Sequence, residues 1–230
     1  MRPPIEFLMP QEIGAELIYS FVIIVCSLMV YYGTKELYEL SSHKGIKYFR
    51  LAFLFFAVAY FFRYSIRFIL SFFNIKTMHE LLPTTMGPTG PLTLFLFMYF
   101  SSIAVFYLLY SVMWKKWNGN FKTIYIFHAL AIVISLISIL SNKEEILLGI
   151  NIFLLAIVSF IYYIVHRESK AKKKRHHLYI VYMLLFIFWI LNIIDILIPS
   201  FLQKFQLLIY LISSGIFLTI LYKVLKKTGN

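Results

Sequence analysis

Cysteine, aspartate and helix-breaking proline are all scarce in this chain of 230 residues. The one cysteine, Cys26, lies inside an apolar run, which excludes a disulfide framework and a cysteine-based metal or redox site. Asp195 is the one aspartate, and acidic residues number 10 against 22 basic ones. The seven prolines are Pro3, Pro4, Pro10, Pro83, Pro88, Pro91 and Pro199. All lie outside the long apolar segments, so we expect no proline hinge within a helix.

Apolar residues, in contrast, are abundant: 61% of the chain is hydrophobic, 19% is aromatic, and the mean hydropathy is +0.81. Soluble domains have about 45 to 50% apolar residues. The excess predicts an all-α, polytopic, seven-transmembrane-helix bundle that forms one domain over residues 1–230, with residues 1–11 at the membrane interface. Each predicted span has about 20 residues, enough to cross roughly 30 Å of hydrocarbon. The spans are 12–32, 48–73, 92–114, 122–141, 145–165, 178–199 and 205–225.

Basic residues are concentrated in alternate connections between these spans. One side holds 16 of them: Lys35, Lys44, Lys47, Arg50, Lys115, Lys116, Lys122, Arg167, Lys170, Lys172, Lys173, Lys174, Arg175, Lys223, Lys226 and Lys227. The other side holds Arg2, Lys76, Lys143 and Lys204. By the positive-inside rule the N-terminus lies outside and the C-terminus inside. The net charge of +12 therefore sets topology and predicts no nucleic acid partner, although the basic loops also suit anionic lipid.

An internal repeat is the second feature of the whole chain. The third and seventh spans align without a gap through Leu96/Leu208, Ser101/Ser213, Ser102/Ser214, Leu109/Leu221, Tyr110/Tyr222, Val112/Val224 and Lys115/Lys227. Weaker matches relate the second span to the sixth and the first span to the fifth. The repeat predicts a 3+1+3 architecture: two parallel three-helix units, 12–114 and 145–225, joined by the linker helix 122–141.

This plan resembles the one shared by microbial rhodopsins and by the PQ-loop and SWEET-type transporters, over the whole chain. The specific motifs of those families are missing. A retinal protein requires a lysine near the middle of the last helix, where Ser213, Ser214 and Gly215 stand here. The one Pro-Gln pair, Pro10-Gln11, precedes the first span. The resemblance therefore implies architecture without implying an activity.

The second span contains two arginines in its interior. At 100° per residue, a polar stripe forms within an arc of roughly 100°. Its members are Tyr60, Arg63, Tyr64, Arg67, Ser71 and Asn74. One guanidinium at the centre of a membrane helix costs between about 2.5 and more than 10 kcal/mol when it faces lipid. We therefore expect both arginines to face protein, a ligand or water.

Asp195 on the sixth span is the predicted partner of Arg67, because both lie about 25 Å along parallel helices. Asn192 lies one turn away on the same face, and Glu16 of the first span reaches the same outer third. The candidate ligand-binding residues are Arg63, Arg67, Asp195, Asn192, Glu16, Tyr60 and Tyr64. Gln206, Tyr210 and Asn151 are secondary candidates.

Two interpretations of these residues stay open. In the structural one, Arg67 and Asp195 form an ion pair that locks two helices, and hydroxyls or backbone carbonyls satisfy Arg63. In the functional one, an outward-facing pocket leaves Arg63 to bind an anionic or carboxylate-bearing ligand through a bidentate contact.

No cofactor is predicted from the remaining polar residues. His128, in the fourth span, is more often a hydrogen-bonded core residue than a ligand, and no second intramembrane histidine accompanies it for haem or zinc. The serine pairs at 101–102 and 213–214 have no neighbouring base and are typical of close helix contacts. An enzyme is therefore the least favoured function.

The function that we favour is a multi-pass sensor or receptor-like module of the cell membrane. It would bind a ligand in its outer half and act through a cytoplasmic or membrane protein partner. The alternatives are a small-solute transporter, which would rock its two halves about a midplane site, and a scaffold subunit of a membrane complex. The lack of proline within the spans favours the sensor over the transporter.

Overall fold

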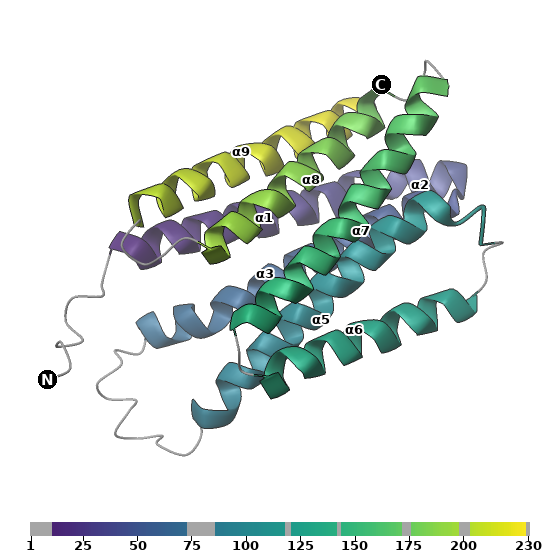
Figure 1. Ribbon diagram of the computed structural model, residues 1–230. Coiled ribbons are helices and arrows are strands. Elements are labelled where there is room, and N and C mark those ends of the chain that lie inside the picture. The colour runs from purple at the N-terminus through teal and green to yellow at the C-terminus, as the bar shows by residue number, and fades with distance from the viewer. Residues whose placement is uncertain are drawn as a thin grey trace, which may run out of the picture.

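The computed structural model is all-helical in the residues that it describes, which are 11–72, 86–117, 121–141, 144–171, 176–197 and 203–228. The long helices are α1 (Gln11–Gly33), α3 (Lys44–Phe72), α5 (Met86–Met113), α6 (Phe121–Ser141), α7 (Glu144–Ala171), α8 (His176–Leu197) and α9 (Gln203–Thr228). Successive long helices run in opposite directions within one bundle (Figure 1). The predicted all-α class and the seven long helices are confirmed.

A short helix, α2 (Lys35–Ser41), follows α1 beyond a break at Thr34. Backbone hydrogen bonds at Thr34 connect the two helices. Its N–H donates to the Val30 carbonyl (3.2 Å), and its carbonyl accepts from the Tyr38 N–H (3.2 Å). Ser42, with a left-handed backbone (φ 48°), then ends α2.

Helix α5 begins earlier than predicted and includes two prolines. It starts at Met86 instead of residue 92, so Pro88 lies in its first turn and Pro91 in its second. Pro88 loses nothing there, because first-turn N–H groups have no helical acceptor. Pro91 cannot donate to the Gly87 carbonyl. The expectation that every proline lies outside the helix interiors is therefore wrong for Pro91, whereas Pro88 lies in the first turn.

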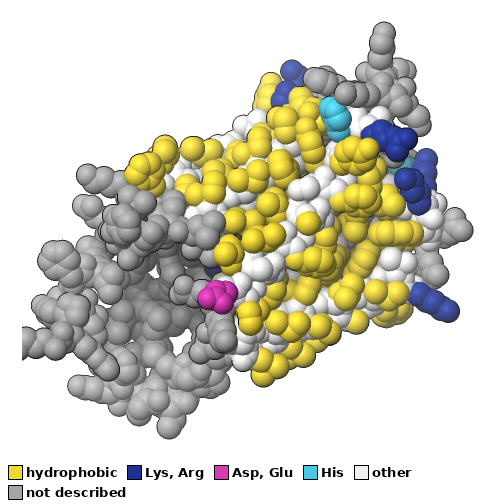
Figure 2. Space-filling model, viewed as in Figure 1, with side chains coloured by type: hydrophobic (Ala, Val, Ile, Leu, Met, Phe, Trp, Pro, Cys, Tyr) yellow, Lys and Arg dark blue, Asp and Glu magenta, His cyan; other side chains and the backbone are white. Residues whose placement is uncertain are grey.

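Six of the described helices are long and apolar enough to cross a membrane. The described apolar part of α8, Tyr179–Asp195, is shorter. Large apolar side chains such as Leu130, Val133 and Phe160 are exposed on α6 and α7, and apolar side chains cover much of the visible lateral surface (Figure 2). A soluble monomer rarely exposes so wide an apolar surface. The coarse prediction of a helical membrane bundle is therefore supported by composition and by surface.

Exposed basic side chains gather at one end of the bundle (Figure 2), which we call the basic end. They are Lys35, Lys44, Lys47, Lys115, Lys116, Lys122, Arg167 and Lys226. We call the opposite end, where α3 and α8 finish, the distal end. Among the described side chains, these exposed lysines and Arg167 thus lie together, as the alternation of basic connections predicted.

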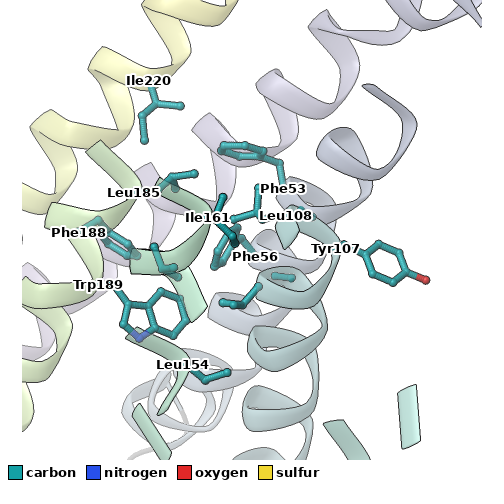
Figure 3. Packing of buried hydrophobic residues seen from close by; sticks show 14 of the residues in the cluster. Phe53, Phe56, Tyr107, Leu108, Leu154, Ile161, Leu185, Phe188, Trp189 and Ile220 are labelled. Carbon is teal, nitrogen blue, oxygen red and sulfur yellow. The ribbon is translucent and has the colours of Figure 1, made fainter. Parts of the chain in front are cut away.

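Six of the long helices form a closed ring in the order α1, α3, α5, α7, α8, α9, and α6 packs on the outside against α5. Across this ring, α3 and α8 meet chiefly through aromatic side chains. The Phe56 and Trp189 rings lie 6.2 Å apart, and the Tyr60 and Phe188 rings lie 6.1 Å apart. Phe188 and Trp189 point toward Phe56, whereas Tyr107 points away from this cluster (Figure 3). Large rings thus fill most of the space between the two helices.

The start of α3 lies very close to the end of α5 at the basic end. A Cβ atom added to Gly45 would stand 2.7 Å from the Ser111 carbonyl oxygen and 2.9 Å from the Trp114 Nε1. A real Cβ cannot approach a backbone oxygen so closely, so glycine is required here for steric reasons.

We expect Gly45→Ala to lower the melting temperature in detergent, because overpacking costs about 1–3 kcal/mol. Gly149→Ala on α7 is the matched control. Nothing lies within 4 Å of the Cβ added there, and alanine improves helix propensity by roughly 0.5–1 kcal/mol. A Gly45→Ala protein that melts at or above the wild-type temperature would show that these helices can separate without cost.

Candidate functional site

A buried ion pair joins α3 and α8 toward the distal end. Arg63 Nη2 lies 3.4 Å from Asp195 Oδ2, and Arg63 Nη1 donates to Asn192 Oδ1 at 3.4 Å. The Asp195 side chain is 8% exposed and that of Arg63 is 26% exposed. The predicted residues Arg63, Asn192 and Asp195 therefore do meet. Arg63 is paired with Asp195, so it is not left over as the functional interpretation expected; a contact between Arg63 and a ligand stays a prediction.

The height of Asp195 explains this difference. Tyr60 contacts both Phe188 and Asn192. Because α3 and α8 run in the same direction, Asp195 comes level with the part of α3 between Arg63 and Arg67. A depth estimate from the sequence cannot separate two arginines one turn apart. The side chains of Arg67, Tyr64 and Glu16 lie outside the described residues, so a contact between Arg67 and Asp195 stays a prediction.

A hydrogen-bonded chain extends from this ion pair to α1. The Tyr60 hydroxyl donates to Asn192 Oδ1 (3.0 Å) and lies 3.3 Å from the Tyr19 hydroxyl. The Tyr19 ring stacks on the ring of Tyr210, with centroids 4.6 Å apart and an interplanar angle of 13°. Gln206 Nε2 donates to the Tyr210 hydroxyl at 2.8 Å. The predicted Tyr60 and the secondary candidates Gln206 and Tyr210 thus lie in one polar layer, to which α1, α3, α8 and α9 contribute.

A cavity of about 190 Å³ lies beside Arg63, between the two halves of the ring. Helices α3, α5, α7 and α8 all contribute to its walls. They are lined by Phe56, Tyr60, Arg63, Leu94, Phe97, Ser101, Leu147, Asn151, Phe188, Trp189 and Asn192. The secondary candidate Asn151 therefore also belongs to the site. The cavity is mostly aromatic, with four polar side chains besides Tyr60.

The hydrogen bonds of these polar side chains leave donors beside the cavity. Asn151 Nδ2 donates to the Leu147 carbonyl (2.8 Å), and Asn192 Nδ2 donates to the Phe188 carbonyl (3.0 Å). A carboxamide nitrogen carries two hydrogens, so each of these groups retains a second one. The Arg63 guanidinium carbon also lies 5.3 Å from the centre of the Phe97 ring. The polar part of the wall is therefore rich in donors, which favours a ligand with acceptor groups.

Sequence reasoning missed the other seven residues of the cavity wall, among them Phe97, Ser101 and Trp189. Trp189 lies three residues before Asn192, so helical spacing placed it on the same face. Its Nε1 donates to the Asn151 carbonyl at 3.2 Å, which fixes the indole against α7. Ser101 was interpreted as a close helix contact, and its Oγ does donate to the Met98 carbonyl of its own helix (3.2 Å). Phe97 had no signal, because every neighbouring residue is equally apolar.

Two other polar groups lie outside this site. His128 of α6 is held between Tyr99 (2.8 Å to Nδ1) and Tyr107 (3.0 Å to Nε2) of α5. The prediction that His128 is hydrogen-bonded is confirmed. At the basic end, Arg50 Nε donates to the Tyr31 carbonyl (3.0 Å), and the guanidinium lies over the Tyr31 ring. The described residues hold no cluster of three metal-ligating side chains.

We expect Arg63→Leu and Asp195→Leu to destabilise the protein singly and to compensate in combination. Removing one partner of a buried pair costs about 3–5 kcal/mol, because the other charge stays buried, whereas replacing both with apolar residues is often nearly neutral. Asp195 is the more buried partner, so Arg63→Leu should cost more than Asp195→Leu. The measurement is a double-mutant cycle from unfolding in detergent.

Arg50→Leu combined with Asp195→Leu is the control for this cycle. Arg50 is also a buried arginine of α3, but it lies about 20 Å from Arg63 along the helix. Effects at distant sites add to within about 0.5 kcal/mol. If Arg63 and Asp195 were equally additive, the ion pair would contribute nothing to the link between α3 and α8.

Comparison with known proteins finds one clear relationship. No family model matches the chain, and no solved structure matches it. A protein of Archaeoglobus fulgidus, described as uncharacterized, is 34% identical over 228 residues, which cover 98% of this chain and 95% of the relative. Identity at this level over nearly the whole of both chains shows common descent. The chain therefore belongs to the same family as this archaeal protein.

Proposed function

We propose that this protein is a multi-pass sensor of the cell membrane that binds a small anionic or carboxylate-bearing ligand in the cavity beside Arg63. The observation that supports this best is the lining of the cavity. Four helices each place a polar side chain on it: Arg63 from α3, Ser101 from α5, Asn151 from α7 and Asn192 from α8. A ligand that contacts all four would bridge both halves of the ring.

The ion pair gives such a ligand a way to change the structure. Arg63 Nη2 and Asp195 Oδ2 lie 3.4 Å apart, which is long for a charge-assisted hydrogen bond. A bidentate carboxylate forms two shorter bonds with a guanidinium. Ligand binding would therefore weaken the contact between Arg63 and Asp195 and alter the link between α3 and α8.

The arrangement of neighbours supports the 3+1+3 repeat within this proposal. Within each unit the helices are adjacent in chain order, α1–α3–α5 and α7–α8–α9. Between the units, the first helix of each lies against the last helix of the other, as α1 against α9 and α5 against α7. A pseudo-twofold axis along the bundle requires this pattern, with α6 as the linker. The ion pair then joins the two equivalent middle helices.

The proposed signal passes from the distal end to the basic end. Helices α3 and α8 continue there, where the Tyr182 hydroxyl lies 2.8 Å from Ser111 Oγ and the Phe49 and Tyr182 rings lie 6.2 Å apart. A shift of α8 relative to α3 would move these contacts. The exposed lysines nearby offer a surface to an acidic cytoplasmic protein, or to anionic lipid.

A transporter is the second candidate, because the cavity lies between the two units, where alternating access requires its site. Pro91 also interrupts the hydrogen bonding of α5 three residues before Leu94, which lines the cavity. Flux of the bound carboxylate into proteoliposomes would favour transport, and binding without flux would favour sensing.

We expect the basic end to be cytoplasmic. In a Cys26→Ala background, cysteines at Lys44 and Lys116 should react with an impermeant maleimide only after the membrane is opened. Cysteines at His79 and Asn142 should react in intact cells. The reverse pattern would place the cavity in the inner half of the membrane and remove the basis for an external ligand.

We expect at least one small carboxylate or inorganic anion to raise the melting temperature of the wild-type protein in detergent. A ligand at a hundred times its Kd stabilises the folded state by about 2.7 kcal/mol. Ser101→Phe, which fills the cavity, and Arg63→Gln, which removes the charge, should abolish this rise.

Arg50→Gln is the matched control, because it removes a still more buried arginine near the other end of α3. This variant should keep the ligand-dependent rise even if its own melting temperature is lower. A panel of anions that leaves the wild-type melting temperature unchanged, or a rise that survives in Ser101→Phe, would contradict the proposed binding site.

A further inference from the structure

We infer that the ligand is an aromatic monocarboxylate of about the size of benzoate, with its ring among Phe97, Phe188 and Trp189 and its carboxylate on Arg63. This inference rests on the proposed function and names the class of ligand for the same site. Three properties of the cavity carry it: its volume, the composition of its walls and the placement of its charge.

The volume of the cavity sets the size of the ligand. An engineered apolar cavity of about 150 Å³ in another protein binds benzene, whereas sites for drug-sized ligands have volumes of about 300–1,000 Å³. At about 190 Å³ the cavity is slightly larger than the benzene site. One aromatic ring with one small substituent fits this space, and a nucleotide or a disaccharide does not. Formate or acetate would leave most of the apolar wall without contacts.

The walls of the cavity favour an aromatic body over a polar one. Phe56, Phe97, Phe188 and Trp189 surround it, and the Trp189 Nε1 is already bonded to the Asn151 carbonyl. The indole thus presents ring carbons to the cavity, with its polar atom turned to α7. A sugar of similar volume would place hydroxyl groups against these rings, where they find no partners.

The charge of the cavity favours one carboxylate. Arg63 lies at one side of the cavity. Its Nη1 lies 3.4 Å from the Asn192 carboxamide oxygen, and its Nη2 lies 3.4 Å from Asp195 Oδ2. Among the described side chains of this group, a ligand carboxylate would be the second carboxylate on one guanidinium, which leaves one excess negative charge. The side chain of Arg67 lies outside the described residues. A dianion such as phosphate would add a further uncompensated charge in a buried site. The combination of one charge and one ring is that of an aromatic monocarboxylate.

The test uses Trp189 as a reporter for 4-bromobenzoate, whose bromine quenches indole fluorescence on contact. In a Trp114→Phe, Trp117→Phe protein, Trp189 is the one tryptophan that remains. We expect saturable quenching, with the Kd raised about tenfold or more by Arg63→Gln, because a site built to hold a charge rejects ligands when that charge is unmatched. Trp189→Phe, which keeps Trp114 and Trp117 at the basic end, should show only the linear quenching of a micelle-dissolved probe.

A series of unlabelled compounds then separates the two parts of the inference. Benzoate should displace the probe about tenfold or more better than benzamide, which lacks the charge, and than acetate, which lacks the ring. The same ranking should appear in the melting temperature of the unmodified protein, which does not depend on the tryptophan variants.

Equal binding of acetate and benzoate would overturn the aromatic assignment while the proposed anion site stands. Equal binding of benzamide and benzoate would overturn the role of the carboxylate. If benzoate fails to bind while another anion raises the melting temperature in an Arg63-dependent manner, the inference fails alone. If no anion binds, the proposed function fails with it.

Discussion

The cost of holding a guanidinium inside an apolar bundle is the constraint on which the distal half of this structure depends. Arg63 needs a partner within reach, and Asp195 supplies one from across the ring at 3.4 Å. Because the arginine side chain is long, α3 and α8 need not pack closely where they meet. Aromatic rings fill most of the space that this separation creates, and the cavity is the part that they leave open. The ion pair and the cavity therefore have one geometric origin.

The same separation explains why the polar layer spans four helices. The chain from Asp195 through Arg63, Asn192 and Tyr60 reaches Tyr19 only because each side chain is long enough to cross an interhelical gap. Each of these side chains contacts the next. A shift of Arg63 would therefore change the contacts of α1 and, through the stacking of Tyr19 on Tyr210, those of α9. A site of this construction couples its ligand to helices that the ligand does not touch.

The sequence was sufficient to predict the helices and much of the site. Where these predictions failed, the reasons are physical. Hydropathy located the ends of the long helices to within a few residues, except for the start of α5, which contains Pro88 and Pro91, and the polar end of α7. Facial periodicity found Arg63, Asn192 and Asp195. It could not choose between Arg63 and Arg67, because one helical turn is smaller than the error in relative depth. It could not reveal the cavity, because a cavity depends on the distance between α3 and α8, which no local pattern records.

Arg50 provides a comparison within the same helix. It is more buried than Arg63, yet it is held by the Tyr31 carbonyl and by the Tyr31 and Tyr38 rings. No carboxylate takes part in those contacts. A buried arginine in this bundle can therefore be accommodated by backbone and aromatic groups, and the polar surroundings of Arg63 include the Tyr60 and Phe97 rings that could serve in the same way. Placing the one aspartate of the chain, nearly buried, beside Arg63 exceeds what burial of that arginine requires. This excess supports the proposal that the pair of charges does more than hold two helices together.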